Sequence, residues 1–544
     1  MPSVKYPYLI IGLIGALLFI PFLGQVHLFD WDEINFAESA REMMETHNYM
    51  QVQINYQPFW EKPPLFFWMQ VLSMNIFGVN EFAARLPNAI CGIVLLGVLF
   101  HIGKKLHSER FGWLMTLIYA GSFLPHFYFK TGIIDPWFNL FIFLGIYQLV
   151  LGISSHEAKQ SPGKHILFAG LFTGLAVLTK GPVGLLIPLL SYFIYVLFRR
   201  KRALLPIKYY LQFALMVLLT ALIWFGLEIK QHGWWFINEF ITYQIRLFKT
   251  HDAGHAGFPG YHFVVLFIGV FPASILIYRW KKNIGETLEQ ANFRLFALIS
   301  FWVVLVLFSL VQTKIIHYSS FCYLPMCYLA AYSFEGIITG TYKIKSWQKY
   351  SFLIIGLVWF LITSGLPLIG MHPEWLQGIL KDPFALENLQ AEVSWNYLLC
   401  IPGIAYGIIV VIAFVWMQQK KYQKALITYF VSTIVFIQVI LLLFIPRIEL
   451  YSQNAAIEFF KSLQGKDCYV VTLGYKSYAN YFYTLKKPGE RKEALDHQWL
   501  LREAVDKPTY FVCKSTMALE ISNEYNPFVE EIYRKNGYVF FKRK

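Results

Sequence analysis

The sequence predicts a polytopic α-helical membrane protein that ends in a small α/β domain. Of its 544 residues, 56% are hydrophobic and only 15% are charged, which would leave a soluble chain of this size far too apolar at its surface. Within residues 1–446, apolar stretches of about 17–25 residues alternate with polar loops, as a bilayer core about 30 Å thick requires. In residues 447–544 the hydrophobicity falls and helices mix with strands, so we expect this part to lie outside the membrane.

The apolar stretches predict about 13 membrane-spanning helices. They begin near Tyr8, Glu81, Phe111, Pro136, His165, Pro182, Pro206, Pro259, Phe293, Ser319, Tyr350, Trp395 and Ala425. The first stretch continues past Gly24 without a small-residue cleavage site, so we expect a retained anchor and not a cleaved signal peptide. Residues 180–182, Lys-Gly-Pro, are interpreted as the join between two spans, because the charges of the later loops keep their alternation only with this break.

Basic residues cluster in every second loop. The clusters are Lys104, Lys105 and Arg110; Lys159 and Lys164; Arg199, Arg200, Lys201 and Arg202; Arg279, Lys281 and Lys282; Lys343, Lys345 and Lys349; and Lys420, Lys421 and Lys424. The positive-inside rule places these loops and the N-terminus in the cytoplasm, so in a bacterial inner membrane the other loops and the C-terminal domain would face the periplasm. This topology accounts for the net charge of +14, and we predict membrane lipids but no nucleic acid as partners.

The first outer loop, residues 25–64, contains a predicted amphipathic helix. Apolar residues recur at helical spacing over residues 34–44, so the helix is expected to lie flat on the membrane. In the simplest interpretation Asp30 and Glu33 form a capping box and Asp32 meets the helix dipole. A cap needs only one carboxylate, however, and three stand within four residues here, so one of them is available as a base in proton transfer.

Further ionisable residues stand where outer loops meet the spans. Glu61 and Lys62 precede two prolines, which fix them on a rigid corner, although a lysine at a membrane boundary can also simply snorkel. Asp135 precedes a proline and serves either as a helix cap or as a second acid. Lys180 ends a span, where either snorkelling or contact with a substrate accounts for it.

Several motifs, in this order, resemble the serial motifs of the GT-C glycosyltransferases, and among them the protein-mannosyltransferase-like group that includes the aminoarabinose transferase of lipid A. They are Asp32-Glu33-Ile34-Asn35-Phe36-Ala37-Glu38, Glu61-Lys62-Pro63-Pro64-Leu65, Ile134-Asp135-Pro136, Leu178-Thr179-Lys180-Gly181 and Lys314-Ile315-Ile316-His317-Tyr318. The resemblance implies a GT-C fold. It also implies a membrane glycosyltransferase that moves a sugar from a polyprenyl (undecaprenyl) phosphate carrier to a lipid, glycan or protein acceptor on the periplasmic face, by a single inverting displacement.

The resemblance further implies roles for residues of this chain. Asp32 takes the position of the base that removes the acceptor's proton, Asp135 that of a second acid, and Glu33 is the third candidate catalytic residue. Negative charge grows on the departing phosphate, so cations placed there stabilise the transition state more than the ground state. The expected substrate-binding residues are Glu61, Lys62, Lys180, Arg246, His255, Lys314, His317 and Tyr318.

No metal or cofactor is predicted to be obligatory. His251 and His255 lie close in sequence, but their glycine-rich surroundings offer no third and fourth ligand, so a divalent metal is not supported. Members that act on lipid A usually have Arg-Tyr where this chain has Asn35-Phe36, and Tyr at the position of Phe59. Loss of one cation and two hydroxyls would weaken recognition of an anionic or hydroxylated group, so the sugar and the acceptor stay open.

The C-terminal domain, residues 447–544, is predicted from alternating helical and strand patterns. Helices are expected at residues 454–463, 475–485 and 497–505, and strands at 468–473, 509–513, 529–533 and 538–542. A disulfide between Cys468 and Cys513 is allowed outside the cytoplasm. The domain has no phosphate-binding loop or nucleophile motif, which leaves acceptor recognition and a structural lid as two open roles.

A polytopic transporter or flippase for lipid-linked sugars is the main alternative function, and a non-catalytic membrane scaffold is the third. Transporters tend to show internal repeats and ionisable residues near the middle of the membrane. This chain shows no repeat, and its candidate residues lie at span ends on one predicted side. That distribution favours chemistry at the membrane surface.

Overall fold

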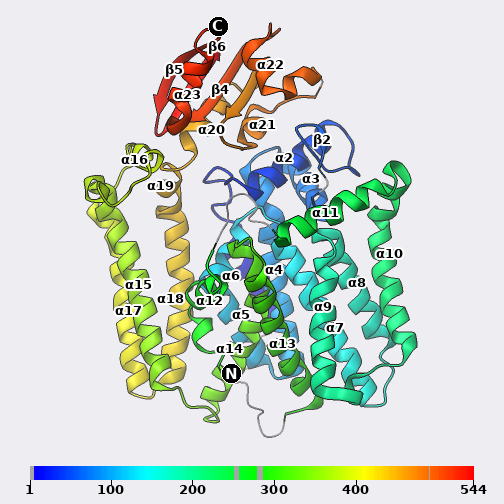
Figure 1. Ribbon diagram of the computed structural model, residues 1–544. Helices are drawn as coiled ribbons and strands as arrows, with labels where there is room; N and C mark the ends of the chain where they lie inside the picture. The colour runs from blue at the N-terminus through cyan, green and yellow to red at the C-terminus, as the bar shows by residue number, and fades with distance from the viewer. Residues whose placement is uncertain (1–4, 60, 250–256, 279–285, 489–490) are drawn as a thin grey trace.

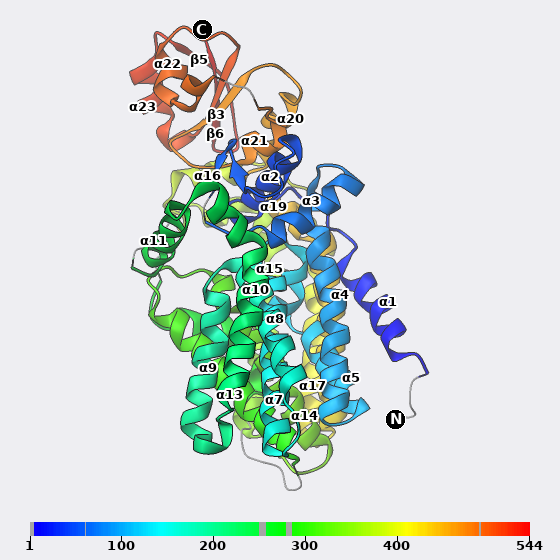
Figure 2. The same cartoon turned by 90° about the vertical axis from the view of Figure 1, so that its right-hand side faces the viewer.

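The computed structural model describes residues 5–59, 61–249, 257–278, 286–488 and 491–544. Helices stand side by side in a long bundle, and the C-terminal residues form a domain on one end of it (Figures 1 and 2). We call this end the domain end and the opposite one the loop end. The chain is a polytopic helical membrane protein with a small sheet near its C-terminus, as the sequence predicts.

Eight of the described helices are long and apolar enough to cross a membrane. They are α4 (Glu81–Leu106), α7 (Asp135–Glu157), α10 (Ile207–His232), α13 (Leu288–Leu310), η5 with α14 (Ile316–Ile338), α15 (Ser346–Met371), η7 with α17 (Tyr397–Gln418) and α18 (Tyr422–Leu443). Helices α1 (Pro7–Phe19), α8 (Gly163–Lys180) and α9 (Val183–Arg199) run along the same bundle but are shorter. The number of about 13 spans therefore stays a prediction.

Two of the predicted spans are broken in the structure. They consist of α5 (Glu109–Ala120), α6 (Phe123–Phe127) and η1 (Tyr128–Lys130) in one case, and of α12 (Tyr261–Gly269) and η4 (Ala273–Ile275) in the other. Each contains a proline, Pro125 or Pro272, whose ring clashes with the carbonyl four residues earlier in a continuous helix. Those carbonyls belong to Gly121 and Ile268, close to the points where α5 and α12 end.

The join at residues 180–182 separates two helices, as predicted. Helix α8 ends at Lys180 and α9 begins at Val183, with Gly181 between them at a φ of +82°. A Cβ on Gly181 would lie 2.5 Å from Cζ of Phe240 in α11 (Trp235–Lys249), so no other residue fits this turn without a shift. The turn leaves Lys180 at the domain end.

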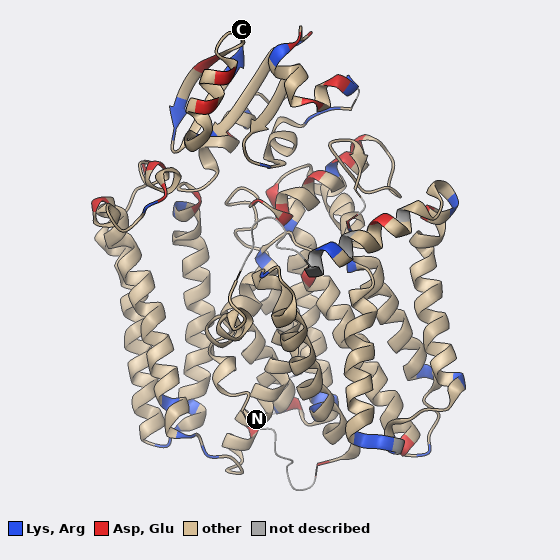
Figure 3. Cartoon of the chain, in the orientation of Figure 1, with Lys and Arg blue, Asp and Glu red and all other residues tan. Residues whose placement is uncertain are grey.

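Charged residues gather at the two ends of the bundle (Figure 3). Lys104 and Lys105 lie in the last turn of α4, Arg199 ends α9, and Lys421 precedes α18, all at the loop end. The predicted clustering of basic residues is thus present there, while the cluster at residues 279–282 lies outside the described residues. Which end faces the cytoplasm stays a prediction from the positive-inside rule.

The loop after α1 folds into α2 (Asp32–Glu45), a hairpin of β1 (Gln53–Ile54) and β2 (Gln57–Pro58), and α3 (Leu65–Phe77). The predicted helix exists, but its expected place on the membrane surface is wrong, because residues 33–43 are all buried. Helix α2 is covered by α3, by the hairpin and by α21 (Ala479–Thr484) of the C-terminal domain. The capping box is also wrong, since Trp31 is the N-cap and no side chain caps the helix.

The C-terminal domain is a four-stranded sheet with helices on its two faces, in the strand order β3-β4-β6-β5. Its elements are α19 (Ile445–Glu449), α20 (Asn454–Ser462), β3 (Tyr469–Leu473), α21, α22 (His497–Arg502), β4 (Thr509–Lys514), α23 (Ser515–Tyr525), β5 (Val529–Lys535) and β6 (Tyr538–Arg543). These agree with the prediction except for α19 and α23, which the sequence analysis does not predict. The division of the chain at residue 446 stays a prediction.

The predicted Cys468–Cys513 disulfide is excluded by the register of the sheet. Strands β3 and β4 are parallel, and Cys513 pairs with Leu473 at the far end of β3 from Cys468. Five residues of extended strand span about 16 Å, well beyond the reach of an S–S bond.

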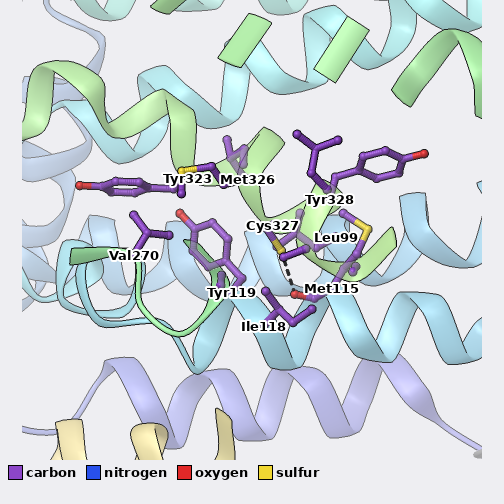
Figure 4. Close-up of a cluster of buried hydrophobic side chains, with 14 of the residues drawn as sticks. Leu99, Met115, Ile118, Tyr119, Val270, Tyr323, Met326, Cys327 and Tyr328 are labelled. Carbon is purple, nitrogen blue, oxygen red and sulfur yellow. Dashed lines mark hydrogen bonds between the residues drawn. The ribbon is translucent and has the colours of Figure 1, made fainter. Parts of the chain in front are cut away.

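Two apolar clusters hold the site in place. One joins Phe36, Phe66 and Phe67 of α2 and α3 to Phe460 and Phe482 of the C-terminal domain, so the domain packs directly on the first loop. The other fills the bundle, where Leu99, Met115, Ile118, Tyr119, Val270, Tyr323, Met326, Cys327 and Tyr328 lie together (Figure 4). There the Cys327 thiol donates to the carbonyl of Met115 at 3.2 Å, which ties α14 to α5. Helix α14 continues directly from η5, whose position is thereby fixed.

Candidate active site

A cavity of about 750 Å³ opens at the domain end of the bundle. Five segments line it: residues 29–36 at the start of α2, residues 61–62, residues 131–139 at the start of α7, residues 180–189 across the α8–α9 turn, and residues 307–321 from α13 into η5. Its polar lining includes Asp30, Asp32, Glu61, Lys62, Asp135, Lys180, His317 and Tyr318. The cavity therefore brings together most of the predicted site residues from distant parts of the sequence.

Asp32 and His317 face each other across the polar part of the cavity. Asp32 Oδ2 lies 3.2 Å from His317 Nε2, and the two side chains are 30% and 16% exposed. Burial raises the pKa of Asp32. The opposing effects are larger, however: the hydrogen bond and charge of His317, with the charges of Lys62 and Lys180, bring the pKa down to about 2. Asp32 is thus an ionised carboxylate at neutral pH.

The His317 segment is held by a short chain of hydrogen bonds. Ser320 donates to the backbone carbonyl of His317 at 2.5 Å. The same hydroxyl oxygen accepts hydrogen bonds from the Tyr128 hydroxyl at 2.6 Å and from the Asn139 amide at 2.8 Å. Residues from η1 and α7 therefore position η5, and with it the imidazole that faces Asp32.

Lys180 and Asp135 form an ion pair at the wall of the cavity. Lys180 is the last residue of α8 and Asp135 the first of α7, so each charge lies at the helix end whose dipole favours it. The Lys180 ammonium also lies 5.6 Å from the centre of the Phe138 ring and 5.4 Å from that of Tyr318. Lys180 points inward and does not snorkel, and Asp135 binds a lysine where a cap was the alternative.

Lys62 and Glu61 complete the polar cluster, 3.9 Å apart. The Lys62 side chain is only 13% exposed. Burial lowers its pKa, and the negative charges of Glu61 and Asp32 oppose that change. A second ammonium group therefore lies close to the Asp32 carboxylate.

Glu33 lies beside this cluster but has a different set of contacts. Its two oxygens accept from Arg85 Nε at 2.7 Å and Nη2 at 2.8 Å, and also from the backbone N–H groups of Phe29 at 2.8 Å and Gly132 at 2.6 Å. Arg85, in α4, also donates to backbone carbonyls between residues 23 and 27. These contacts favour a positioning role for Glu33 over the predicted catalytic one.

Three predicted residues are not part of the cavity wall as described. Lys314 is 7% exposed and donates to the carbonyls of Phe308, Ser309 and Val311, so its charge lies on the C-terminal end of α13. Arg246 is exposed on α11 and does not line the cavity. His255, like the neighbouring His251, lies outside the described residues.

A large part of the cavity wall is apolar. It is formed by α9 and the end of α13, through Val183, Leu185, Leu186, Ile187, Leu189, Leu307, Phe308 and Val311. Leu186 and Leu189 are 47% and 45% exposed, so the wall offers an accessible hydrocarbon surface next to the charged cluster. Among the described residues, no group of three His, Cys, Asp or Glu side chains is placed to hold a metal ion.

Sequence reasoning did not anticipate Arg85 or the unsatisfied amide of Asn35. Arg85 follows the expected start of a span and carries no motif, so only the fold reveals its pairing with Glu33. Asn35 and Phe36, the two positions that differ from lipid A-modifying members, both line the cavity. The side-chain oxygen of Asn35 has no hydrogen-bond partner among the described residues.

Comparison with known proteins agrees with the motifs. Residues 61–224 match the family described as dolichyl-phosphate-mannose-protein mannosyltransferase. Relatives named undecaprenyl phosphate-alpha-4-amino-4-deoxy-L-arabinose arabinosyl transferase include one from Photorhabdus laumondii, 22% identical over 66% of both chains, and one from Shewanella sediminis, 25% identical over 61% of this chain and 60% of its own. The chain thus spans somewhat under two thirds of the length of these curated relatives.

The overall architecture matches a solved structure over nearly its whole length. ArnT from Cupriavidus metallidurans, in its crystal structure bound to undecaprenyl phosphate, gives a TM-score of 0.77 at 16% identity, covering 99% of this chain and 98% of that one. The apo form of the same protein gives 0.75. The chain thus shares its fold with this protein, and its motifs resemble, in the same order, those of the GT-C glycosyltransferases.

Proposed function

We propose that this chain transfers a sugar from a polyprenyl (undecaprenyl) phosphate carrier to a lipid, glycan or protein acceptor. The observation that carries the proposal is the cavity, which joins an apolar wall to a cluster of acids and cations. A polyprenyl-phosphate sugar has the same three parts: a hydrocarbon tail, a charged phosphate and a polar sugar. We place the reaction at the periplasmic face of a bacterial inner membrane, which rests on the positive-inside rule.

In this proposal Lys62 and Lys180 bind the donor phosphate. Both ammonium groups lie beside the apolar wall, where a lipid tail and its phosphate would meet. As the bond between the sugar and the phosphate breaks, negative charge moves onto the phosphate, and fixed cations in a poorly solvated site stabilise that charge. Asp135 keeps Lys180 in place, and the Tyr318 ring confines its ammonium group.

Asp32 acts as the base. A carboxyl group with a pKa near 2 is a weak base, but two of the charges that depress the pKa belong to the lysines that would bind the phosphate. A bound phosphate offsets those charges, so the pKa of Asp32 rises and the carboxylate becomes able to take a proton. The acceptor is therefore activated only when the donor is in place.

The displacement is a single inverting step. The acceptor O–H or N–H bond breaks and its proton passes to Asp32, while the acceptor atom forms a new bond to the anomeric carbon. The bond from that carbon to the phosphate oxygen breaks, and its electron pair stays with the phosphate. Attack opposite the leaving phosphate inverts the anomeric configuration, and no covalent sugar–enzyme intermediate forms.

The identity of the sugar is a separate question. The relatives are named for 4-amino-4-deoxy-L-arabinose, but Asn35 and Phe36 line the cavity of this chain where an arginine and a tyrosine are usual. A site without that cation and hydroxyl binds an anionic partner less strongly. We propose a hexosyl- or pentosyltransferase and do not assign lipid A as its acceptor.

Mass spectrometry of cell envelopes with and without the chain tests the proposal. Lipids, glycans and proteins from cells that lack it should miss one sugar, and the modified and unmodified molecules together identify sugar and acceptor. Cells carrying the chain again should regain the sugar. An unchanged set of linkages, combined with altered sidedness of a lipid-linked sugar, would contradict the transferase and support the flippase.

A further inference from the structure

A loop of the C-terminal domain reaches the rim of the catalytic cavity. The loop consists of residues 474–478 and follows directly from β3. Its Ser477 hydroxyl donates a hydrogen bond to Oδ2 of Asp30, and a second hydrogen bond to Asp30 comes from the backbone of Tyr478. Asp30 itself lines the cavity, two residues before Asp32.

The backbone around Asp30 is also held by the C-terminal domain. The Gln453 amide donates to the carbonyl of Leu28, and its oxygen accepts from the N–H of Asp30 at 3.3 Å. The N–H of Leu28 donates to the hydroxyl of Tyr483 at 2.8 Å. Residues 28–30 thus take their position from three points of a domain that is more than 400 residues away in the sequence.

Aromatic and cationic groups of both parts meet at the same rim. The rings of Trp31 and Tyr478 lie 5.3 Å apart. The exposed Lys476 places its ammonium group 4.7 Å from the centre of the Trp31 ring and 5.5 Å from that of Tyr478. Trp31 lines the cavity, so an aromatic surface and a positive charge stand at its rim, on segments other than those that carry the Lys180–Asp135 pair and the apolar wall.

We propose that residues 29–31 and loop 474–478 together form the acceptor-binding subsite, which accepts an anionic glycan or glycolipid whose charge is met by Lys476 and not at positions 35 and 36. Asp30 accepts a hydrogen bond from a hydroxyl or amine of the acceptor, Trp31 contacts the face of its sugar ring, and Lys476 attracts its negative charge. The inference rests on the proposed transferase function and gives the C-terminal domain a part in it. Ser477 is a positioning residue, because it acts through Asp30.

The subsite also predicts a particular dependence on pH. Asp30 is an exposed residue that opens onto the cavity; partial desolvation of its carboxyl raises its pKa to about 6, although the bonds from Ser477 and Tyr478 lower it. The titratable groups around it are Tyr475, Tyr478 and Tyr538, whose pKa values are raised, with Lys476 and Glu61 near Tyr478. Below about pH 6 Asp30 is protonated, and acceptor binding weakens.

Steady-state kinetics of the full-length protein test the subsite. The acceptor is the unmodified molecule isolated from cells that lack the chain, and donor-site binding is measured separately with undecaprenyl phosphate. Ser477→Ala should raise the KM for the acceptor about tenfold, the effect of losing one hydrogen bond to a charged group. The acidic limb of the pH–activity profile of this variant should move to higher pH, because the variant loses a hydrogen bond that lowers the pKa of Asp30. Its affinity for undecaprenyl phosphate should not change.

Two matched controls belong to the same domain. Ser515→Ala removes a buried hydroxyl that has no hydrogen-bond partner among the described residues. It should leave the acceptor KM, the affinity for undecaprenyl phosphate and the pH profile unchanged. Lys476→Gln should raise the acceptor KM and weaken its dependence on salt, whereas Lys466→Gln, at another exposed lysine, should not.

The outcomes separate this inference from the proposed function. If the wild-type protein transfers a sugar but Ser477→Ala and Lys476→Gln behave like their controls, the subsite is wrong and the transferase stands. Equal losses of acceptor use and of undecaprenyl phosphate binding would also overturn it, since the domain would then only support the fold. If the wild-type protein transfers no sugar at all, the proposed function fails first.

Discussion

Two acid–cation pairs lie at the domain end, and they differ in the number of hydrogen-bond donors that they leave for a substrate. In the Glu33–Arg85 pair, all five N–H donors of the guanidinium are used, two by the carboxylate and the others by backbone carbonyls. In the Asp135–Lys180 pair, the ammonium has three donors, and Asp135 Oδ1 is its one hydrogen-bond acceptor among the described residues. The first pair is saturated and the second has donors to spare.

The comparison shows why the acids of one motif are not equivalent. Asp32 and Glu33 are neighbours in α2, but their side chains leave the helix in different directions. Glu33 is enclosed by a network that fixes the first loop, whereas the one hydrogen-bond partner of the Asp32 carboxylate among the described residues is the imidazole of His317, and Asp32 stays open to the cavity. Spare hydrogen-bonding capacity, and not burial or charge alone, distinguishes the residues that we assign to chemistry.

Asp32→Asn should give the largest loss of activity. The amide keeps the size of the side chain but takes up no proton, so kcat should fall by about 10²- to 10⁴-fold, the usual contribution of a general base. Undecaprenyl phosphate binding and the thermal midpoint of unfolding should stay close to wild type, because the site loses no cation. Near-normal kcat in this variant would move the base to another residue, and Asp30, which lines the same cavity, is one candidate.

Glu33→Gln should act on stability where Asp32→Asn acts on rate. The substitution leaves the Arg85 charge buried without its counter-ion, which costs about 3 kcal/mol or more when a buried pair is broken. The thermal midpoint in lipid nanodiscs should drop clearly, and activity should fall in proportion to the folded fraction. Glu109→Gln, which breaks a partly exposed pair with Lys104, is the control and should cost under about 1 kcal/mol. A fully stable but inactive Glu33→Gln protein would restore Glu33 to catalysis.

The sequence predicted which segments meet, but not how each side chain is used. The order of the motifs indicated that Asp32, Lys62, Asp135, Lys180 and His317 share a site, and the cavity brings them together. Helical periodicity reports where apolar residues stand and not what covers them, so α2 was expected on the membrane surface. The saturation of Glu33 depends on Arg85 and on backbone groups of other loops, which no local pattern marks. Likewise, the capping of α13 by Lys314 depends on where that helix ends.

Lys180→Met should weaken donor binding without the loss of fold expected for Glu33→Gln. Hydrogen bonds from a charged donor to a phosphate contribute about 1.5–3 kcal/mol, so the Kd for undecaprenyl phosphate should rise about 10- to 100-fold. The variant also leaves Asp135 without its lysine, and the double variant Asp135→Asn with Lys180→Met separates that effect. Lys230→Met changes an exposed lysine at the same end of the bundle and should leave the Kd unchanged. If Lys180→Met, the double variant and Lys230→Met all bound undecaprenyl phosphate with the affinity of the wild type, Lys180 would be excluded from the phosphate site.

Lys314→Met should have the smallest effect, although its motif first indicated the same phosphate role as Lys180. Each lysine lies at the C-terminal end of a helix, but the Lys314 ammonium already binds three carbonyls of α13, while that of Lys180 faces the cavity.

Removing Lys314 should lower stability by about 0.3–1 kcal/mol, the contribution of a cation at a helix end. The Kd for undecaprenyl phosphate should stay within about twofold of wild type, less than the loss of one hydrogen bond to a charged group. A larger rise in that Kd would mean that Lys314 leaves the α13 carbonyls when the donor binds, and that saturation in the unliganded protein does not decide which cations bind the phosphate.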